Sequence, residues 1–256
     1  MGAGPSGLAT AIAAKQHGLE YAVIEKGVLV NSIFNFPTHM VYFTTPELLE
    51  IGGLPLVTPF EKPTRLESLR YYRRVVDTYG IQASFHREVT DIARQGDAFV
   101  VTTASVPPGS RRANGSEDRA SWRARAVVLA IGYYDIPNTL GVPGEQLPHV
   151  SHYYKEPHPY YRQRVVVVGG KNSAAEAALE LFRAGAHVTL VHRRATLGDS
   201  IKYWVRPDIE NRIKEGSIAA RFETHVVEIR PDVVVVDRGC VRDEIPAAGV
   251  LLLTGY

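Results

Sequence analysis

The stretch that most constrains the fold is residues 164–194, RVVVVGGKNSAAEAALELFRAGAHVTLVHRR. Its run of four valines suits a strand buried on both faces and is too short to span a membrane. Two glycines then turn the chain, and apolar residues recur at helical spacing as far as Gly185, before a second extended run begins. We therefore expect a strand–helix–strand unit with a tight glycine turn after its first strand.

A turn of this kind is suited to bind a pyrophosphate. Its backbone N–H groups and the positive end of the following helix both point at the anion. The predicted contact residues are Gly169, Gly170, Lys171, Asn172 and Ser173. Asn172 and Ser173 are also expected to cap the helix. Lys171 replaces the middle glycine of the GxGxxA pattern, and we expect its ammonium group to grip the phosphates.

The tip of the second strand predicts which nucleotide binds. About 20 residues after the glycines, an acidic residue would bond the ribose 2′-hydroxyl of NADH. This chain instead has His192, Arg193 and Arg194 at that place. Two guanidinium groups can hold a 2′-phosphate in a bidentate manner, which predicts NADPH. The alternative is a solvated basic turn after an ordinary strand.

A second dinucleotide fingerprint opens the chain. Gly2, Gly4 and Gly7 satisfy GxGxxG, a helical stretch follows, and a short strand ends in Glu25, the acid expected on a ribose. The alternative is a glycine-rich loop with a chance glutamate. Such a fingerprint should follow a buried strand, and Met1 stands one residue before Gly2. We therefore expect this half-site to be incomplete.

Residues 27–63 are rich in Asn, Thr, Pro and aromatic residues, which favours an irregular loop wrapped around a flat ring. The polar side chains expected to bond the ring edges, or alternatively to serve as turn residues, are Asn31, Asn35, Thr44 and Thr45. Residues 64–80 form an amphipathic pattern with a capping box at Thr64 and Glu67, which predicts a helix.

The next segments predict β structure. We expect a strand ending near residues 88–89, a hairpin turned at residues 95–97, a mobile tip without a site at 105–121, and a strand at 122–134 that runs into Gly132. The chain's last residues repeat this strand–glycine–tyrosine ending. This duplication predicts a first domain made of residues 1–140 and 247–256, interrupted by a second domain at 141–246.

Composition excludes several classes of protein. The net charge of +2 and the scattered arginine pairs argue against a nucleic-acid partner. No apolar run approaches the ~20 residues of a membrane helix. A lone cysteine, Cys240, excludes an internal disulfide and fits a reducing cytoplasm, and we expect it to be inert. The three histidines of the connection at 135–163, His149, His152 and His158, lack the ligand spacing of a structural metal site.

His152 is the best candidate for acid–base catalysis, because it lies in a tyrosine-rich connection before the second unit. The alternative is a packing histidine between the two domains.

Several long strings make a resemblance specific. GAGPSG, VVVVGGKNSAAEAALEL, VTLVHRR, VSHYYKEPHPYY and SIKYWVRPDIENRIKEGSI resemble bacterial bacillithiol-disulfide reductases, which are thioredoxin-reductase-like flavoproteins. The resemblance implies an α/β fold of two Rossmann-like domains, an FAD domain of the three-layer ββα type and an inserted NADPH domain. The FAD residues that it implies are Gly2, Gly4, Pro5, Ser6, Gly7, Glu25, Lys26, Asn35, Thr45, Val89 and Gly132. The NADPH residues are Gly169, Gly170, Lys171, Asn172, Ser173, His192, Arg193 and Arg194.

The implied activity is a cytoplasmic, NADPH-dependent reduction of a small disulfide such as bacillithiol disulfide. The resemblance leaves open whether the chain forms a homo-oligomer. Two departures stand beside it. The chain ends at Tyr256, before the family's Gly-Asp segment for FAD, so this site is expected to be cut at both ends. Ser6 stands where relatives often have a cysteine, and no CxxC pair exists. Two alternatives stay open: a flavin monooxygenase, or a chain that binds NADPH without turnover.

Overall fold

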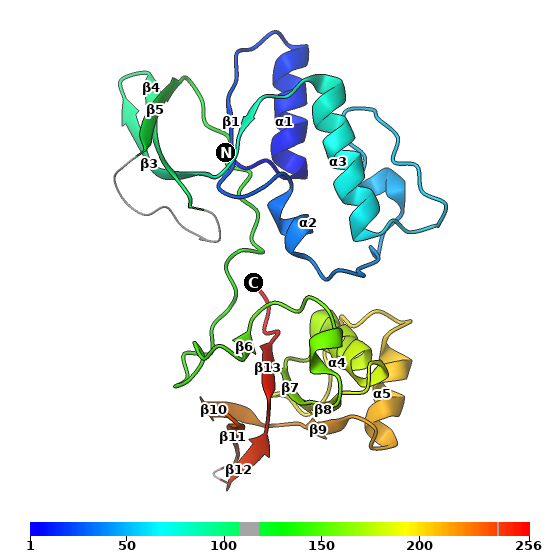
Figure 1. Cartoon of the computed structure of the whole chain (residues 1–256). Helices are drawn as coiled ribbons and strands as arrows, with labels where there is room; N and C mark the ends of the chain where they lie inside the picture. The colour runs from blue at the N-terminus through cyan, green and yellow to red at the C-terminus, as the bar shows by residue number, and fades with distance from the viewer. Residues whose placement is uncertain (108–117, 240) are drawn as a thin grey trace. The chain divides into compact units, whose positions relative to one another are not determined.

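The computed structural model describes residues 1–107, 118–239 and 241–256. The chain divides into two compact units, Met1–Asp135 and Ile136–Tyr256, and each is described by itself (Figure 1). In these described ranges no helix is both long and apolar enough to cross a bilayer. The centre of the predicted tip at 105–121 lies outside the described residues, as does Cys240.

The first unit combines helices with two small sheets. Its elements are α1 (Pro5–Gln16), β1 (Val23–Ile24), α2 (Asn31–Asn35), the 3₁₀ helix η1 (Pro46–Leu48), α3 (Arg65–Tyr79), β2 (Ala83–Ser84), β3 (Arg87–Gln95), β4 (Ala98–Ser105) and β5 (Arg119–Ala124). β1 and β2 pair in parallel, while β3, β4 and β5 form an antiparallel sheet. The core packs Leu8 and Ile12 of α1 with Tyr72 and Val75 of α3.

The helix predicted at 64–80 is confirmed as α3. The Thr64 hydroxyl accepts the Glu67 N–H at 3.3 Å, and the Glu67 carboxylate accepts the Thr64 N–H at 2.7 Å. This capping box satisfies two backbone donors at the start of the helix. Gly80 ends it in the left-handed conformation, with φ 56°.

Two predicted strands of this unit are shorter than expected. The first ends at Ser84 because His86 has a left-handed φ of 54° that turns the chain, and β3 then begins at Arg87. The strand predicted at 122–134 stops at Ala124. Beyond it, the Met1 ammonium group donates to the Val128 carbonyl at 2.9 Å and the Ala130 N–H donates to the Met1 carbonyl at 2.8 Å. Pairing with the single residue Met1 is too short to form a β-strand, so this segment is irregular.

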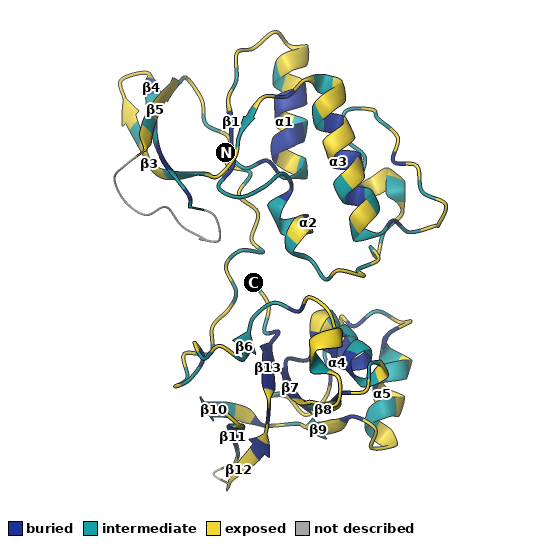
Figure 2. Cartoon of the chain, viewed as in Figure 1, coloured by how far each residue is buried: buried dark blue, intermediate teal, exposed yellow. Residues whose placement is uncertain are grey.

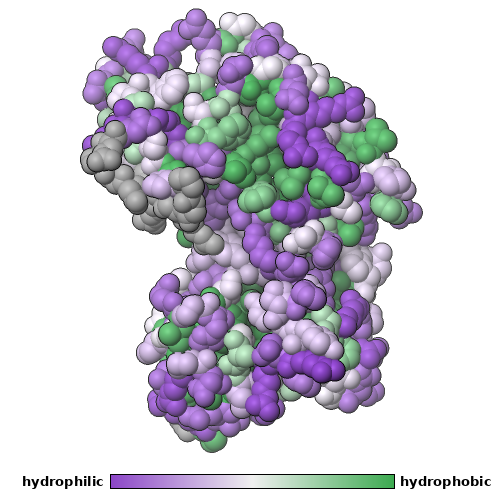
Figure 3. Space-filling view, in the orientation of Figure 1, coloured by the Kyte–Doolittle hydropathy of each residue, from purple (hydrophilic) through white to green (hydrophobic). Residues whose placement is uncertain are grey.

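Large apolar side chains stay exposed in this unit. Figure 3 shows apolar surface gathered on one of its faces. The most exposed of these side chains are Leu48, Val57, Phe60, Leu129, Ile131 and Tyr133.

The second unit is built on a parallel sheet. Its elements are β6 (Val150–Ser151), η2 (His158–Tyr160), β7 (Arg164–Val168), α4 (Asn172–Arg183), β8 (His187–Val191), α5 (Arg206–Lys214), β9 (Ala219–Arg221), β10 (His225–Ile229), β11 (Val233–Arg238), β12 (Val241–Pro246) and β13 (Gly249–Leu252). Five strands pair in the order β6-β13-β7-β8-β9, and β10, β11 and β12 form a separate antiparallel sheet.

The valine run of β7 is buried on both faces, as predicted. Val165 and Val167 pack in the cluster that contains α4, whereas Val166 and Val168 pack with β11 and β12. Figure 2 shows the neighbouring strand β13 buried along its length. Strand alternation therefore gives one face of the sheet to the helices and the other to the antiparallel sheet.

The two compact units differ from the predicted domain ranges at both ends. β13 pairs with β7 through residues 249–252, so the final strand belongs to the second unit and not to the first. The division between the units falls at Asp135 rather than at residue 140. An apolar strand that follows a connection can complete either sheet, and its sequence does not distinguish the two.

Candidate functional site

The turn between β7 and α4 has room only for glycine. Gly169 has φ 155°, and a Cβ there would lie 2.6 Å from the Leu253 carbonyl oxygen. A Cβ on Gly170 would lie 2.3 Å from Cε1 of the His192 imidazole. The turn therefore packs closely against Leu253 and His192, at the carboxyl end of the strand where an open α/β sheet binds its ligand.

The strand order places this turn at the switch point of the sheet. β7 is followed on one side by β8 and on the other by β13. Ligands of doubly wound sheets lie where the order reverses in this way. α4 begins directly after the turn, and no side chain caps its first N–H groups. These orphan donors and the helix dipole fit a pyrophosphate.

Asn172 has a different role from the one predicted. Its Nδ2 donates to the Ser200 carbonyl at 3.0 Å, and its Oδ1 accepts the Lys202 N–H at 2.9 Å. The side chain therefore braces a distant loop instead of capping the helix, and the residue at the N-cap position is Lys171. The Gly198 N–H also donates to the Gly170 carbonyl at 2.8 Å. The loop is thus fastened to the turn at two places.

The basic tip after β8 lies beside the same turn. Arg193 and Arg194 are exposed. In the described ranges their guanidinium groups have no hydrogen-bond or ion-pair partner. The ring of His192 lies against Gly170, and its Nε2 is buried and unpartnered there. Burial, followed by the charges of Arg194 and Arg193, lowers the pKa of His192. The tip therefore offers two free guanidinium groups and a neutral imidazole to an anion.

The glycine turn of the first unit is equally restricted. A Cβ on Gly7 would lie 1.9 Å from the Gly2 carbonyl oxygen, and a Cβ on Gly2, at φ 101°, would lie 2.2 Å from the Ala130 carbonyl oxygen. Gly4 instead faces open space at the start of α1, where no side chain caps the helix. Pro5 and an exposed Ser6 form the first turn of that helix. The arrangement fits a second pyrophosphate.

Glu25 is a buried carboxylate at the end of β1, with 7% of its surface exposed. Its Oε2 accepts the Ala3 N–H at 2.7 Å and its Oε1 accepts the Gly27 N–H at 2.8 Å. Each carboxylate oxygen keeps a second lone pair, so both can still accept a ribose hydroxyl. The acid and the glycine turn are joined directly through Ala3.

The other predicted residues of this unit are less closely gathered. Lys26 Nζ lies 3.1 Å from a carboxylate oxygen of Asp135, a partner that the sequence did not indicate. Asn35 donates from Nδ2 to the Asn31 carbonyl. Its own carbonyl accepts the Tyr134 hydroxyl at 3.3 Å, which brings α2 beside the segment of Gly132. Thr45 precedes η1, and Val89 lies in β3, whose first residue, Arg87, donates its N–H to the Glu25 carbonyl at 2.9 Å.

His152 lies within the second unit. Its Nε2 is 3.3 Å from Oε1 of Glu145, whose side chain is almost fully buried. Glu145 also accepts the N–H groups of Leu140 and Gly141 at 2.8 and 2.7 Å. The carboxylate therefore holds the connection of residues 140–145 in place, and His152 supports it. A catalytic role for His152 remains a prediction.

An acidic pair on α4 was missed by the sequence analysis. Glu180 Oε2 accepts the hydroxyl of buried Tyr154 at 2.7 Å. Glu176 stands one helical turn earlier, and burial together with the charge of Glu180 raises its pKa to about 7. The i, i+4 spacing of Glu176 and Glu180 could have indicated that the two carboxylates are neighbours. The same spacing is also typical of a solvent-exposed helix face.

The two glycine turns, each followed by a helix and a strand that ends in a side chain suited to a ribose or its phosphate, fit a dinucleotide-dependent oxidoreductase. The chain belongs to the pyridine nucleotide-disulphide oxidoreductase family, whose model matches residues 1–256. Members of this family are FAD- and NADPH-dependent, and the two turns described above fit these two cofactors.

Two relatives show where the chain lies within this class, and a third protein shares its fold. It is 41% identical over 240 residues to the bacilliredoxin reductase Bdr of Bacillus subtilis, covering 93% of this chain and 70% of that protein. The structure of the bacillithiol disulfide reductase Bdr from Bacillus cereus superposes with a TM-score of 0.93 at 40% identity, covering 100% of this chain and 76% of that one. A flavin-containing monooxygenase from Stenotrophomonas maltophilia shares the fold, with a TM-score of 0.72, 20% identity and coverage of 100% and 76%.

Proposed function

We propose that this chain reduces a low-molecular-weight disulfide, such as bacillithiol disulfide, with electrons from NADPH that pass through FAD. The observation that carries the proposal is the pair of glycine turns, one beside Glu25 and one beside the free guanidinium groups of Arg193 and Arg194. The similarity to the bacillithiol disulfide reductase Bdr of Bacillus cereus at 40% identity supports the substrate class, while the Bacillus subtilis relative is named a bacilliredoxin reductase. The monooxygenase shares the fold at only 20% identity.

The residues of the chain bind and orient the cofactors. In the first unit, Gly2, Gly4 and Gly7 admit a pyrophosphate and Glu25 accepts ribose hydroxyls. In the second, the start of α4 faces the other pyrophosphate, and Arg193 and Arg194 hold the 2′-phosphate. When bound, the cofactors supply the electron chemistry, from NADPH to flavin and from flavin to the disulfide.

The route to the substrate has no cysteine relay in this proposal. The chain's single cysteine lacks a partner for a CxxC pair, and Ser6 cannot form a thiolate. The residues of the chain would therefore bind and position the substrate without relaying electrons to it. We also place the protein in the cytoplasm, because its free cysteine suits a reducing compartment.

The test is anaerobic oxidation of NADPH by the FAD-loaded protein. We expect addition of bacillithiol disulfide to accelerate the loss of NADPH absorbance, with release of two thiols for each NADPH, while glutathione disulfide serves as the control substrate. No acceleration, together with peroxide or an oxygenated product in air, would contradict the proposal and favour a monooxygenase. A colourless protein that binds NADPH without turnover would support the third alternative.

A further inference from the structure

The second unit contains a groove that begins away from its dinucleotide site. The groove has a volume of about 490 Å³ and lies between the five-stranded sheet and the strand β12. Arg164 and His187 line it, and they are the first residues of β7 and β8. The glycine turn follows the last residue of β7, about 16 Å away at 3.3 Å for each residue. This end of the groove therefore lies at the opposite edge of the sheet, whereas the carbonyl of Arg221, at its other end, accepts the His192 N–H at 2.9 Å beside the basic tip.

The register of the strands explains why a hollow forms here. Arg164 pairs with His187, Thr189 pairs with Ala219, and Val191 pairs with Arg221. Because side chains alternate along a strand, these positions share the face that the antiparallel sheet covers elsewhere. The small side chains of Thr189 and Ala219 form the floor, and longer basic side chains stand at the two ends.

The charges in the groove are unbalanced. In the part of the chain that the structure describes, the side chains of Arg164, His187 and Arg221 form no hydrogen bond or ion pair. The one carboxylate in the lining is Glu244, and it already accepts Arg230 Nη1 at 2.7 Å. Arg164 and His187 are neighbours across the two strands, an arrangement that costs stability when both are charged. An anion would remove this cost.

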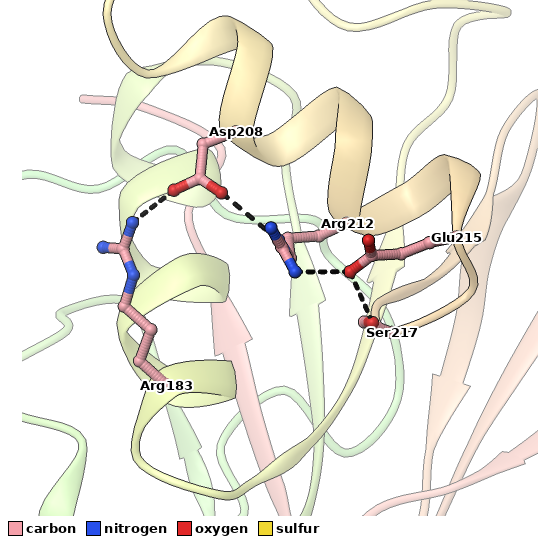
Figure 4. Close-up of polar contacts among 5 residues, drawn as sticks. All are labelled: Arg183, Asp208, Arg212, Glu215 and Ser217. Atoms are coloured by element: carbon pink, nitrogen blue, oxygen red, sulfur yellow. Dashed lines mark hydrogen bonds and ion pairs between the residues drawn. The ribbon is translucent and has the colours of Figure 1, made fainter.

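One rim of the groove is held by a chain of polar contacts (Figure 4). Arg183 of α4 contacts Asp208 of α5, which accepts Arg212 Nε at 3.3 Å. Arg212 in turn donates to Glu215 at 2.6 Å, and Glu215 accepts the Ser217 hydroxyl at 2.6 Å. Ser217 lines the groove, so its position is fixed by α5.

We propose that this groove binds a small molecule with an anionic group at each end, one held by Arg164 and His187 and the other by Arg221. His187 and the ladder partner of Arg221 are four residues apart on β8, which separates the two ends by about 13 Å of strand. Guanidinium groups prefer phosphate and carboxylate ligands. The volume of the groove is that of a metabolite site. A bisphosphate or a long dicarboxylate has this chemistry.

The test is isothermal titration calorimetry with fructose 1,6-bisphosphate as the probe. Fructose 6-phosphate, which has only one phosphate group, is the control ligand. With NADPH at saturation, we expect the bisphosphate to bind and the monophosphate to bind at least about tenfold more weakly. Arg164→Gln and Arg221→Gln should each weaken the bisphosphate at least about tenfold. Arg242→Gln is the matched control, because it removes one charge from β12 outside the lining.

Substitutions at each site should affect only the ligand of that site. Arg164→Gln should leave the Kd for NADPH unchanged, and Arg193→Gln should weaken NADPH while leaving the bisphosphate unaffected. Loss of bisphosphate binding when NADPH is added would show that the probe occupies the nucleotide site and would overturn the proposal. Equal weakening by Arg242→Gln, or equal affinity for both probes, would also overturn it. His187→Gln gives a second variant should Arg164→Gln alter the circular dichroism spectrum.

Discussion

The raised pKa of Glu176 predicts that the second unit loses stability as the pH rises. Burial is the main cause of the increase to about 7, and the charge of Glu180 adds to it. The folded state therefore holds this proton more tightly than the unfolded state, where the carboxyl has its usual value of 4.5. Folding favours the protonated carboxyl group. The contribution of Glu176 to the free energy of unfolding is therefore fully present below pH 4.5 and is lost as the pH rises through about 7.

The size of the effect follows from the two pKa values. A difference of about 2.5 between them corresponds to about 3.4 kcal/mol, at 1.36 kcal/mol for each pKa unit. Glu176 is only partly buried, and solvent screening reduces this figure. We therefore expect about 1.5 kcal/mol. Glu176→Gln stays neutral at every pH and should be more stable than the wild type by roughly that amount at about pH 8.5, but not at about pH 5.

Urea unfolding of the nucleotide-free protein measures this difference. Trp204 is the only tryptophan of the second unit, so a Trp122→Phe background makes fluorescence report that unit alone. Glu180→Gln should reduce the pH dependence in part, because it removes the neighbouring charge. Glu210→Gln on α5 is the control, since its carboxylate is exposed beside Arg206. If wild type and Glu176→Gln show the same pH dependence, the reasoning is wrong.

Four further changes test other parts of the structure. Gly7→Ala should abolish FAD binding, measured by flavin absorbance after reconstitution, because its Cβ would meet the Gly2 carbonyl oxygen at 1.9 Å. Glu25→Gln should lower the affinity for FAD about tenfold or more by weakening charge-assisted hydrogen bonds, and an unchanged affinity would remove Glu25 from the site. Thr64→Ala should destabilise the first unit by about 1 kcal/mol in urea unfolding followed by Trp122 fluorescence, because it breaks the capping box. His152→Gln should leave the pH profile of NADPH oxidation unchanged if the residue only supports Glu145, whereas loss of one limb of the profile would show acid–base catalysis.

The parts of the fold with local causes could be predicted from the sequence. The capping box of α3, the valines of β7 and the glycine turns each depend on residues within a few positions of one another. The basic tip at Arg193 and Arg194 could also be found, because its distance from the glycines is set by one helix and one strand.

The remaining features depend on contacts between distant segments. The position of Asn172 in the sequence predicts a helix cap, yet its side chain donates a hydrogen bond to Ser200, in a loop 28 residues further along the chain. The pKa of Glu176 depends on burial that its own helix does not reveal. β13 could have completed either sheet, and only its pairing with β7 decides. No local pattern indicates that Asp135 is the ion-pair partner of Lys26.

The central claim is that Arg193 and Arg194 recognise the 2′-phosphate of NADPH. Isothermal titration of the protein with NADPH and with NADH tests it most directly. Two charge-assisted contacts, each worth about 1.5–3 kcal/mol, predict that NADPH binds at least about a hundredfold more tightly. Arg193→Gln combined with Arg194→Gln should bring the two affinities together. Equal or tighter binding of NADH by the wild type would contradict the claim.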